Sequence, residues 1–227
     1  MNTTHAEDMP QYRMDDATQD PVAIGKIICL ARTYKKHAKE MKSEVPKDPL
    51  LFLKPASAVI FDGEAIIIPQ KSKCLHHEVE LGVVIGKKCK NISKEEALDY
   101  VMGYLLALDI TARDIQAEAK KNGWPWGIAK GFDTFAPISD VLLKNKTIDP
   151  NNLELSLSVN GTLRQQANTS QMIFSVEEII AFISSIMTLE AGDLIMTGTP
   201  EGVGELATGD KVEAKLGELT ALHVFVK

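Results

Sequence analysis

The chain has few cysteines and aromatic residues and lacks long apolar runs. Its 227 residues include three cysteines, Cys29, Cys74 and Cys89, which are widely spaced and form no C-x-x-C pair. This spacing argues against zinc and dithiol redox motifs and favours a reducing, cytoplasmic location. No apolar run approaches the length of about 20 residues that a membrane-spanning helix needs, so we expect no membrane association.

Positive charge is also scarce. Lysine and arginine number 25 against 31 aspartate and glutamate residues, which gives a formal net charge of −6 at pH 7. Because a nucleic-acid surface needs a positive field, the balance argues against nucleic-acid binding as the main activity. The hydrophobic content of 44% and the charged content of 25% are typical of a globular protein with a buried core.

The pattern after residue 21 is rich in strands. Residues 1–21 are polar and acidic and lack the features of a secretory signal, so we expect a disordered or extended tail there. The expected strands cover 22–30, 76–87, 104–108, 153–159, 193–196, 211–215 and 219–226. The expected helices cover 33–42, 93–101, 113–121 and a segment that a Ser175–Glu178 capping box opens. Strands outnumber helices and seldom alternate with them, which predicts a single α+β, β-rich domain over 22–227.

Two glutamates and an aspartate are candidate metal ligands. Glu78 and Glu80 lie two apart in an expected strand, so their side chains share one face. Two adjacent carboxylates repel unless one is protonated or a cation lies between them, and oxygen donors favour Mg²⁺, Mn²⁺ or Ca²⁺. Asp109 ends the apolar run YLLAL and is a third candidate. The bare glutamate pair is equally compatible with a solvated strand face, which is the commoner case.

Two pairs of polar residues have helical spacing. His37 and Glu40 are three apart, and a carboxylate beside an imidazole raises its basicity, so this pair could deprotonate water. Arg113 and Gln116 repeat the spacing and could bind the carboxylate of a substrate. Each pair, taken alone, is also compatible with an exposed helix face.

A lysine and a threonine complete the set of candidates. Lys130 lies between the aromatic stretch Trp124-Pro125-Trp126 and Phe132, where an ammonium could stabilise developing negative charge, although a lone lysine is usually at the surface. Thr199 lies in the turn-rich segment 197–204, which could offer its hydroxyl and backbone N–H groups to an anion. That segment lacks the lysine and spacing of a phosphate-binding loop, so nucleotide binding is not supported.

Five segments in this order resemble the fumarylacetoacetate hydrolase family, most closely its small single-domain members that act on acylpyruvates, oxaloacetate or related 2-oxo dicarboxylates. The segments are HHEVELGVVIG at 76–86, LALDITARDIQ at 106–116, WGIAKGFDTFAPIS at 126–139, NGTLRQQANTSQMIF at 160–174 and TGTPEGVG at 197–204. The resemblance implies the β-rich mixed-sheet roll of this family's C-terminal domain, in a protein that is usually a homodimer.

The resemblance also implies roles for individual residues. The implied ligands of Mg²⁺ or Mn²⁺, with Ca²⁺ possible in a crystal, are Glu78, Glu80 and Asp109. The implied catalytic residues are Lys130 near the metal and a water-activating pair on a lid helix, His37 and Glu40. The implied substrate contacts are Arg113, Gln116 and Thr199. The family's usual Gly-Arg-Asn-Tyr stands here as Ala31-Arg32-Thr33-Tyr34, so we expect a different lid hinge.

The expected reaction is cleavage of a C–C bond beside the ketone of a small 2-oxo acid. Acylpyruvate hydrolysis would use Glu40 and His37 to activate water, whereas oxaloacetate decarboxylation would need only an enolate stabilised by the metal. Two alternatives remain open. One is an isomerase or decarboxylase acting on 2-hydroxyhepta-2,4-diene-1,7-dioate, and the other is a non-enzymatic protein with a structural metal site.

Overall fold

The computed structural model describes residues 10–15, 18, 20–41 and 44–227. Most of the predicted tail, namely residues 1–9, 16–17 and 19, lies outside the described residues. Within its described part, Tyr12 is buried and its hydroxyl donates to the carbonyl oxygen of Gly192 at 3.0 Å. Met14 forms an isolated β-bridge with Val141. These contacts attach residues 10–15 to the strands that follow.

The largest sheet has eight strands and mixed polarity. Its order is β2-β1-β13-β6-β7-β9-β3, and β10 pairs with β7 outside that path. The strands are β1 (Ile27–Ala31), β2 (Leu50–Lys54), β3 (Val59–Phe61), β6 (Val79–Ile85), β7 (Val101–Leu108), β9 (Ala136–Ile138), β10 (Leu142–Leu143) and β13 (Leu194–Met196). All of β6 and nearly all of β7 are buried, because both faces of the sheet are covered.

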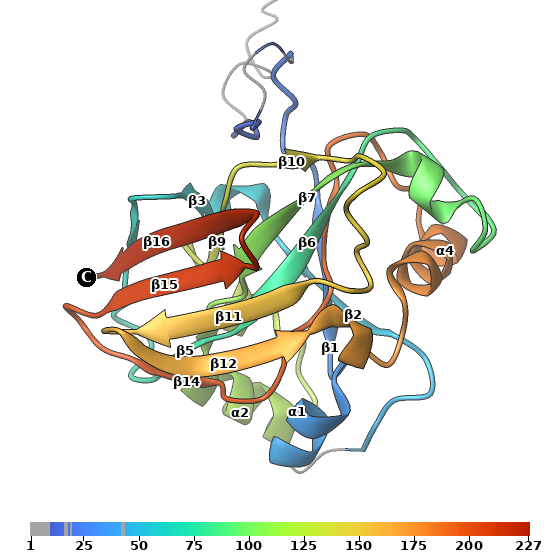
Figure 1. Cartoon of the computed structure of the whole chain (residues 1–227). Helices are drawn as coiled ribbons and strands as arrows, with labels where there is room; N and C mark the ends of the chain where they lie inside the picture. The colour runs from blue at the N-terminus through green and yellow to red at the C-terminus, as the bar shows by residue number, and fades with distance from the viewer. Residues whose placement is uncertain (1–9, 16–17, 19, 42–43) are drawn as a thin grey trace, which may run out of the picture.

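Two smaller sheets complete the architecture. The five-stranded sheet has the order β12-β11-β15-β16-β4, and the three-stranded sheet has the order β14-β5-β8. Their strands are β4 (Ala65–Ile66), β5 (Leu75–His77), β8 (Thr111–Ala112), β11 (Glu154–Val159), β12 (Thr162–Asn168), β14 (Gly204–Leu206), β15 (Lys211–Leu216) and β16 (Thr220–Val226). Figure 1 shows the five-stranded sheet packed across β6 and β7. The main hydrophobic core lies between these layers and includes Leu81 of β6 and Leu157 of β11.

Short-range sequence signals fix several element boundaries. Ser175 and Glu178 form the predicted capping box at the start of α4 (Val176–Ile186). Asn160 and Gly161 have φ angles of 51° and 75°, and they make the tight turn between β11 and β12. The prediction of an α-helix over 93–101 is wrong, because only the 3₁₀ helix η2 (Ala97–Tyr100) forms. There the carbonyl oxygen of Tyr100 accepts a bond from Gly86 N at 2.7 Å, which starts the pairing of β7 with β6.

The remaining helices lie at one end of β6 and β7. They are α1 (Lys35–Glu40), α2 (Arg113–Asn122) and α3 (Gly127–Lys130), with the short 3₁₀ helices η1 (Ala56–Ala58) and η3 (Thr169–Gln171) elsewhere. Figure 1 shows α1 and α2 together at the lower end of the molecule. In the described part of the chain, no helix is both long and apolar enough to cross a membrane. Mixed sheets with few helices confirm the predicted α+β, β-rich class.

Candidate active site

Antiparallel pairing of β6 and β7 brings three carboxylates together. Glu78 lies between β5 and β6, Glu80 lies within β6, and Asp109 follows the last residue of β7. Val79 pairs with Leu108, so Asp109 comes next to Glu78, and Asp109 N donates to the carbonyl oxygen of Glu78 at 2.8 Å. One oxygen from each carboxylate lies within 4.8 Å of the others, and all three residues are buried. We call Glu78, Glu80 and Asp109 the carboxylate cluster.

Lys130 is the central cation of this cluster. Its Nζ donates to Glu78 Oε2 at 2.9 Å, to Thr111 Oγ1 at 2.7 Å and to Asp109 Oδ2. Lys130 is the last residue of the short helix α3, and its side chain is 2% exposed. Burial disfavours the ammonium form, yet Asp109 and Glu78 outweigh burial and raise the pKa of Lys130. The predicted lysine is therefore a buried ion-pair partner and not a surface side chain.

Negative charge is unevenly compensated within the cluster. Burial opposes ionisation of Glu78, but the cations of Lys130 and Arg113 hold its pKa below the usual range. Burial, followed by the nearby Asp109 and Glu78 carboxylates, raises the pKa of Glu80 well above the usual range. Glu80 Oε2 accepts one bond from Gly198 N at 2.7 Å. A buried set of donors made up only of carboxylate oxygens fits a hard divalent cation.

Arg113 and Gln116 form the coupled pair that their spacing predicts. Both lie in the first turns of α2, where Arg113 Nη1 donates to Gln116 Oε1 at 2.8 Å and Nη2 donates to Glu78 Oε1. Because the Gln116 oxygen accepts from the arginine, its amide NH₂ group is left as the free donor. The pair thus brings guanidinium and amide donors to the edge of the carboxylate cluster.

His37 and Glu40 contact each other on α1. His37 Nδ1 lies 3.1 Å from Glu40 Oε2, and the imidazole is buried at 7% exposure. Glu40 Oε1 also accepts from Gly202 N at 3.0 Å, which attaches the helix to the loop after β13. An ionised carboxylate only accepts hydrogen bonds, so His37 Nδ1 donates and Nε2 carries the lone pair.

The segment before α1 departs from the usual family sequence and has its own hydrogen bonding. Thr33 is fully buried, and its Oγ1 donates to the carbonyl oxygen of Thr197 at 2.7 Å. Gly198 has a φ of 96°, and a Cβ atom there would collide with the Thr33 hydroxyl. Arg32 has a φ of 62°, a left-handed conformation that is uncommon outside glycine. The threonine thus ties the start of α1 to the loop after β13.

Sequence reasoning missed two buried polar residues at the site. Lys54 Nζ lies 2.7 Å from Asp109 Oδ1 and donates to the carbonyl oxygens of Ile110 and Lys130 at 3.0 Å and 2.6 Å. The only feature of the nearby sequence that could indicate a buried lysine is its position at the end of the apolar run LLFLK. That run becomes β2, and Lys54 is the one residue of this strand that is buried.

Gln165 is the second missed residue, and it fixes Thr199. Gln165 Nε2 donates to Thr199 Oγ1 at 2.8 Å, while its Oε1 accepts from Val79 N at 3.1 Å and lies 2.9 Å from His77 Nδ1. Thr199 Oγ1 in turn donates to the carbonyl oxygen of Val79 at 2.9 Å. The available signal is the alternation of β12, which places Gln165 on the buried face.

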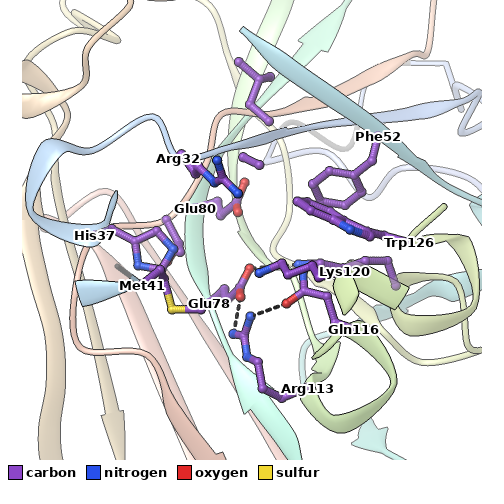
Figure 2. A pocket seen from close by; sticks show the side chains of 14 residues that line it. Arg32, His37, Met41, Phe52, Glu78, Glu80, Arg113, Gln116, Lys120 and Trp126 are labelled. Atoms are coloured by element: carbon purple, nitrogen blue, oxygen red, sulfur yellow. Dashed lines mark hydrogen bonds and ion pairs between the residues drawn. The ribbon is translucent and has the colours of Figure 1, made fainter. Parts of the chain in front are cut away.

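These residues surround one cavity of about 30 Å³, which opens to solvent (Figure 2). Of the predicted site residues, those that line it are His37, Glu78, Glu80, Arg113, Gln116, Lys130 and Thr199. Asp109 and Glu40 do not line it, but they contact Lys130 and His37, which do. Phe52 and Trp126, whose ring centroids are 5.8 Å apart, supply an apolar side. The cavity is lined by both acidic and basic groups.

Comparison with known proteins agrees with this geometry. Residues 26–227 match the model of the fumarylacetoacetate (FAA) hydrolase C-terminal family. The chain belongs to this family. Both the predicted family and its fold are confirmed, since solved members with the same architecture superpose closely.

Three similar proteins are enzymes by name. The chain is 51% identical over 202 residues to the mitochondrial oxaloacetate tautomerase FAHD1 of Arabidopsis thaliana. The aligned residues cover 89% of this chain and 91% of the relative. It is 52% identical over 189 residues to the mitochondrial oxaloacetate decarboxylase of Dictyostelium discoideum, with coverages of 83% and 87%. A solved structure of fumarylpyruvate hydrolase from Pseudomonas aeruginosa, in complex with Mn²⁺ and pyruvate, has a TM-score of 0.93 at 33% identity and coverages of 100% and 99%.

Proposed function

We propose that the chain is a divalent-metal-dependent enzyme that cleaves a C–C bond beside the ketone of a 2-oxo acid. The reaction is oxaloacetate decarboxylation, acylpyruvate hydrolysis or both. The observation that carries this proposal is the buried carboxylate cluster, whose oxygens approach within 4.8 Å of one another next to a cavity that Glu78, Glu80, Arg113 and Lys130 line. The names of the similar decarboxylase and hydrolase support it, as does the complex of the latter with Mn²⁺ and pyruvate.

The proposed metal is Mg²⁺ or Mn²⁺, held by Glu78, Glu80 and Asp109. The donor set is entirely carboxylate and buried, and Glu80, whose pKa is raised by burial and its two acidic neighbours, has no ion pair within the described residues. A bound divalent cation polarises the carbonyl of a 2-oxo acid and stabilises the negative charge that develops on its oxygen.

Arg113, Gln116 and Lys130 are proposed to bind and orient the substrate. The guanidinium of Arg113 and the free NH₂ group of Gln116 are donors that suit the planar carboxylate next to the ketone. The ammonium of Lys130 lies at the edge of the same cavity, where it offsets negative charge on the ketone oxygen during bond cleavage. The Thr199 hydroxyl, held by Gln165, contacts the substrate from the loop after β13.

His37 and Glu40 are proposed to activate water for hydrolysis. Nε2 of His37 accepts a proton from a water molecule as that water attacks the distal carbonyl, while Nδ1 donates to Glu40. The carboxylate of Glu40 stabilises the imidazolium that forms and keeps the ring in one orientation. Decarboxylation releases CO₂ without an attacking water, so this pair is not needed for it.

A second candidate is the interconversion of the keto and enol forms of oxaloacetate. The name of the similar Arabidopsis protein supports it. This reaction moves a proton between C3 and the ketone oxygen, and His37, which lines the cavity, is the proposed group for that transfer. The isomerase alternative would use the same proton transfer on a longer unsaturated substrate.

Turnover assays test these candidates directly. We expect purified protein with Mg²⁺ or Mn²⁺ to consume oxaloacetate or acetylpyruvate, to lose activity in excess EDTA and to regain it with added metal. Full activity in excess EDTA would contradict the metal-dependent scheme. Thermal stabilisation by metal without turnover of any 2-oxo acid would instead support the structural-metal alternative.

Two further expectations remain predictions. The homodimer implied by the family resemblance can be tested by light scattering of the purified chain, which would give about twice the chain mass of 24.9 kDa. The cytoplasmic location, expected from cysteine usage and the N-terminal composition, can be tested by fractionating cells that produce the protein.

A further inference from the structure

The cavity contains two kinds of cation. Arg113 and Lys130 both pair with Glu78. Arg32 and Lys120 line the same cavity, but within the described residues neither has a carboxylate or hydrogen-bonding partner for its side-chain nitrogens. The charges of Arg113 and Lys130 are thus balanced by a carboxylate of the protein, whereas those of Arg32 and Lys120 are not. A cavity with such unpaired positive charge is suited to binding an anionic group of a ligand.

Arg32 reaches the cavity from the end of β1. Figure 2 shows its guanidinium pointing inward on the side of Glu80. Its φ of 62° is unfavourable for a residue with a Cβ atom, and such conformations cluster at ligand-binding positions. The structure therefore maintains an uncommon backbone conformation at a residue whose side chain faces the cavity.

Lys120 reaches the cavity from α2. Its Nζ lies 5.2 Å from the ring centroid of Trp126, at the mouth of the cavity. Burial, together with repulsion from Arg113 and Arg32, lowers the pKa of Lys120. Arg32, Arg113 and Lys120 thus line the same cavity close enough to repel one another.

We propose that Arg32 and Lys120 form a second anion site, which binds the distal carboxylate of a 2-oxo dicarboxylate. Arg113 and Gln116 would hold the carboxylate next to the ketone, and the second site would hold the carboxylate at the other end. This inference rests on the proposed function and narrows it, because it makes dicarboxylates preferred over acylpyruvates that have a neutral acyl end.

Binding of two unreactive probes tests the site. The probes are 2-oxoglutarate and 2-oxopentanoate, which share the 2-oxo acid end and the chain length and differ in the distal carboxylate. Neither has a carboxylate in the β-position to the ketone, so neither decarboxylates. Calorimetry with Mg²⁺ would compare the wild type with Arg32→Met, Lys120→Met and the control Lys121→Met, a neighbour on α2 that is exposed and does not line the cavity.

We expect the wild type and Lys121→Met to bind 2-oxoglutarate about tenfold or more tightly than 2-oxopentanoate, because charge-assisted hydrogen bonds are worth about that factor. Arg32→Met and Lys120→Met should each lower the affinity for 2-oxoglutarate about tenfold. Their affinity for 2-oxopentanoate should equal that of the wild type. Arg32→Lys and Lys120→Arg, which keep the charge, should retain most of the discrimination. Equal wild-type affinities, or equal weakening of both probes in the Met variants, would overturn the proposal.

Kinetics separate this proposal from the proposed function. In the same variants, the ratio of kcat/KM for oxaloacetate to that for acetylpyruvate should fall about tenfold while Lys121→Met keeps the wild-type ratio. If the wild type turns over neither substrate yet still discriminates between the probes, the function fails and the anion site stands. If it turns over both substrates but does not discriminate between the probes, the anion site fails and the function stands.

Discussion

The inner part of the site is formed by buried side chains, whereas most side chains of its outer wall reach the surface. The inner charge cluster consists of Lys54, Glu78, Glu80, Asp109 and Lys130. The outer wall consists of Arg32, His37 and Lys120, together with Glu40, which contacts His37. The ion-paired side chains of the inner cluster are at most 7% exposed, whereas the side chain of Glu40 is 35% exposed. We infer that the inner cluster provides the chemistry common to several 2-oxo acid reactions and that the outer wall selects among them.

Replacing a carboxylate of the inner charge cluster should have the largest effect. Asp109→Asn and Glu80→Gln remove proposed metal ligands, so every 2-oxo acid reaction should fall by about a thousandfold or more, since a metal supplies several kcal/mol of charge stabilisation. Steady-state rates on oxaloacetate and acetylpyruvate measure this loss. Glu205→Gln, which alters an exposed carboxylate of β14, is the matched control and should leave the rates unchanged. Near-normal rates in both Asp109→Asn and Glu80→Gln would show that the inner charge cluster does not take part in the reaction.

Replacing His37 should separate the two parts of the site. His37→Ala removes the proposed water-activating base, so acetylpyruvate hydrolysis should fall by about a hundredfold or more, the usual contribution of general base catalysis. Oxaloacetate decarboxylation, which consumes no water, should stay within a few fold of the wild type. The ratio of the two rates is the measurement. Equal losses in both reactions would contradict the division between inner cluster and outer wall.

Removing Lys54 should cost folding stability. Lys54→Met takes one cation from the buried Asp109 carboxylate, and breaking a buried pair costs about 3 kcal/mol. Urea denaturation measures this free energy of unfolding. The control Lys88→Met breaks an exposed pair with Glu190 and should change it by at most about 1 kcal/mol. Equal effects of the two substitutions would show that Lys54 is not a structural counter-ion of the inner cluster.

Glu40→Gln should have the smallest effect of the series. The amide keeps the shape of the side chain but no longer stabilises an imidazolium at His37, so hydrolysis should fall by about tenfold, or roughly 1.4 kcal/mol of activation free energy. The same variant should decarboxylate oxaloacetate at the wild-type rate. A greater loss than in His37→Ala would assign the primary proton transfer to Glu40 and contradict its supporting role.

Local signals were sufficient for much of the fold. The Ser175–Glu178 capping box and the Asn160-Gly161 turn depend on residues within four positions of each other, and the structure forms both. The Ser93–Glu96 pair also makes its hydrogen bonds, but no α-helix follows. Pairing of β7 with the distant β6 starts at once and limits this segment to η2, and the local sequence contains no information on that pairing.

The same limit applies to the site. The pairing of β6 with β7 brings Asp109 beside Glu78, and motif resemblance was enough to group these carboxylates. Lys54 and Gln165 could not be predicted as site residues, because their hydrogen-bonding partners lie in segments far along the chain. A lysine at the end of an apolar run is usually at the surface, and only the assembled sheet shows that this one is buried beside Asp109.

Manganese binding tests the central claim most directly. Crystals of the protein grown with Mn²⁺ should show one strong anomalous peak per chain, coordinated by an oxygen from each of Glu78, Glu80 and Asp109, and the peak should vanish in Asp109→Asn. A peak elsewhere, or an Asp109 side chain turned away from the two glutamates with Mn²⁺ present, would contradict the account.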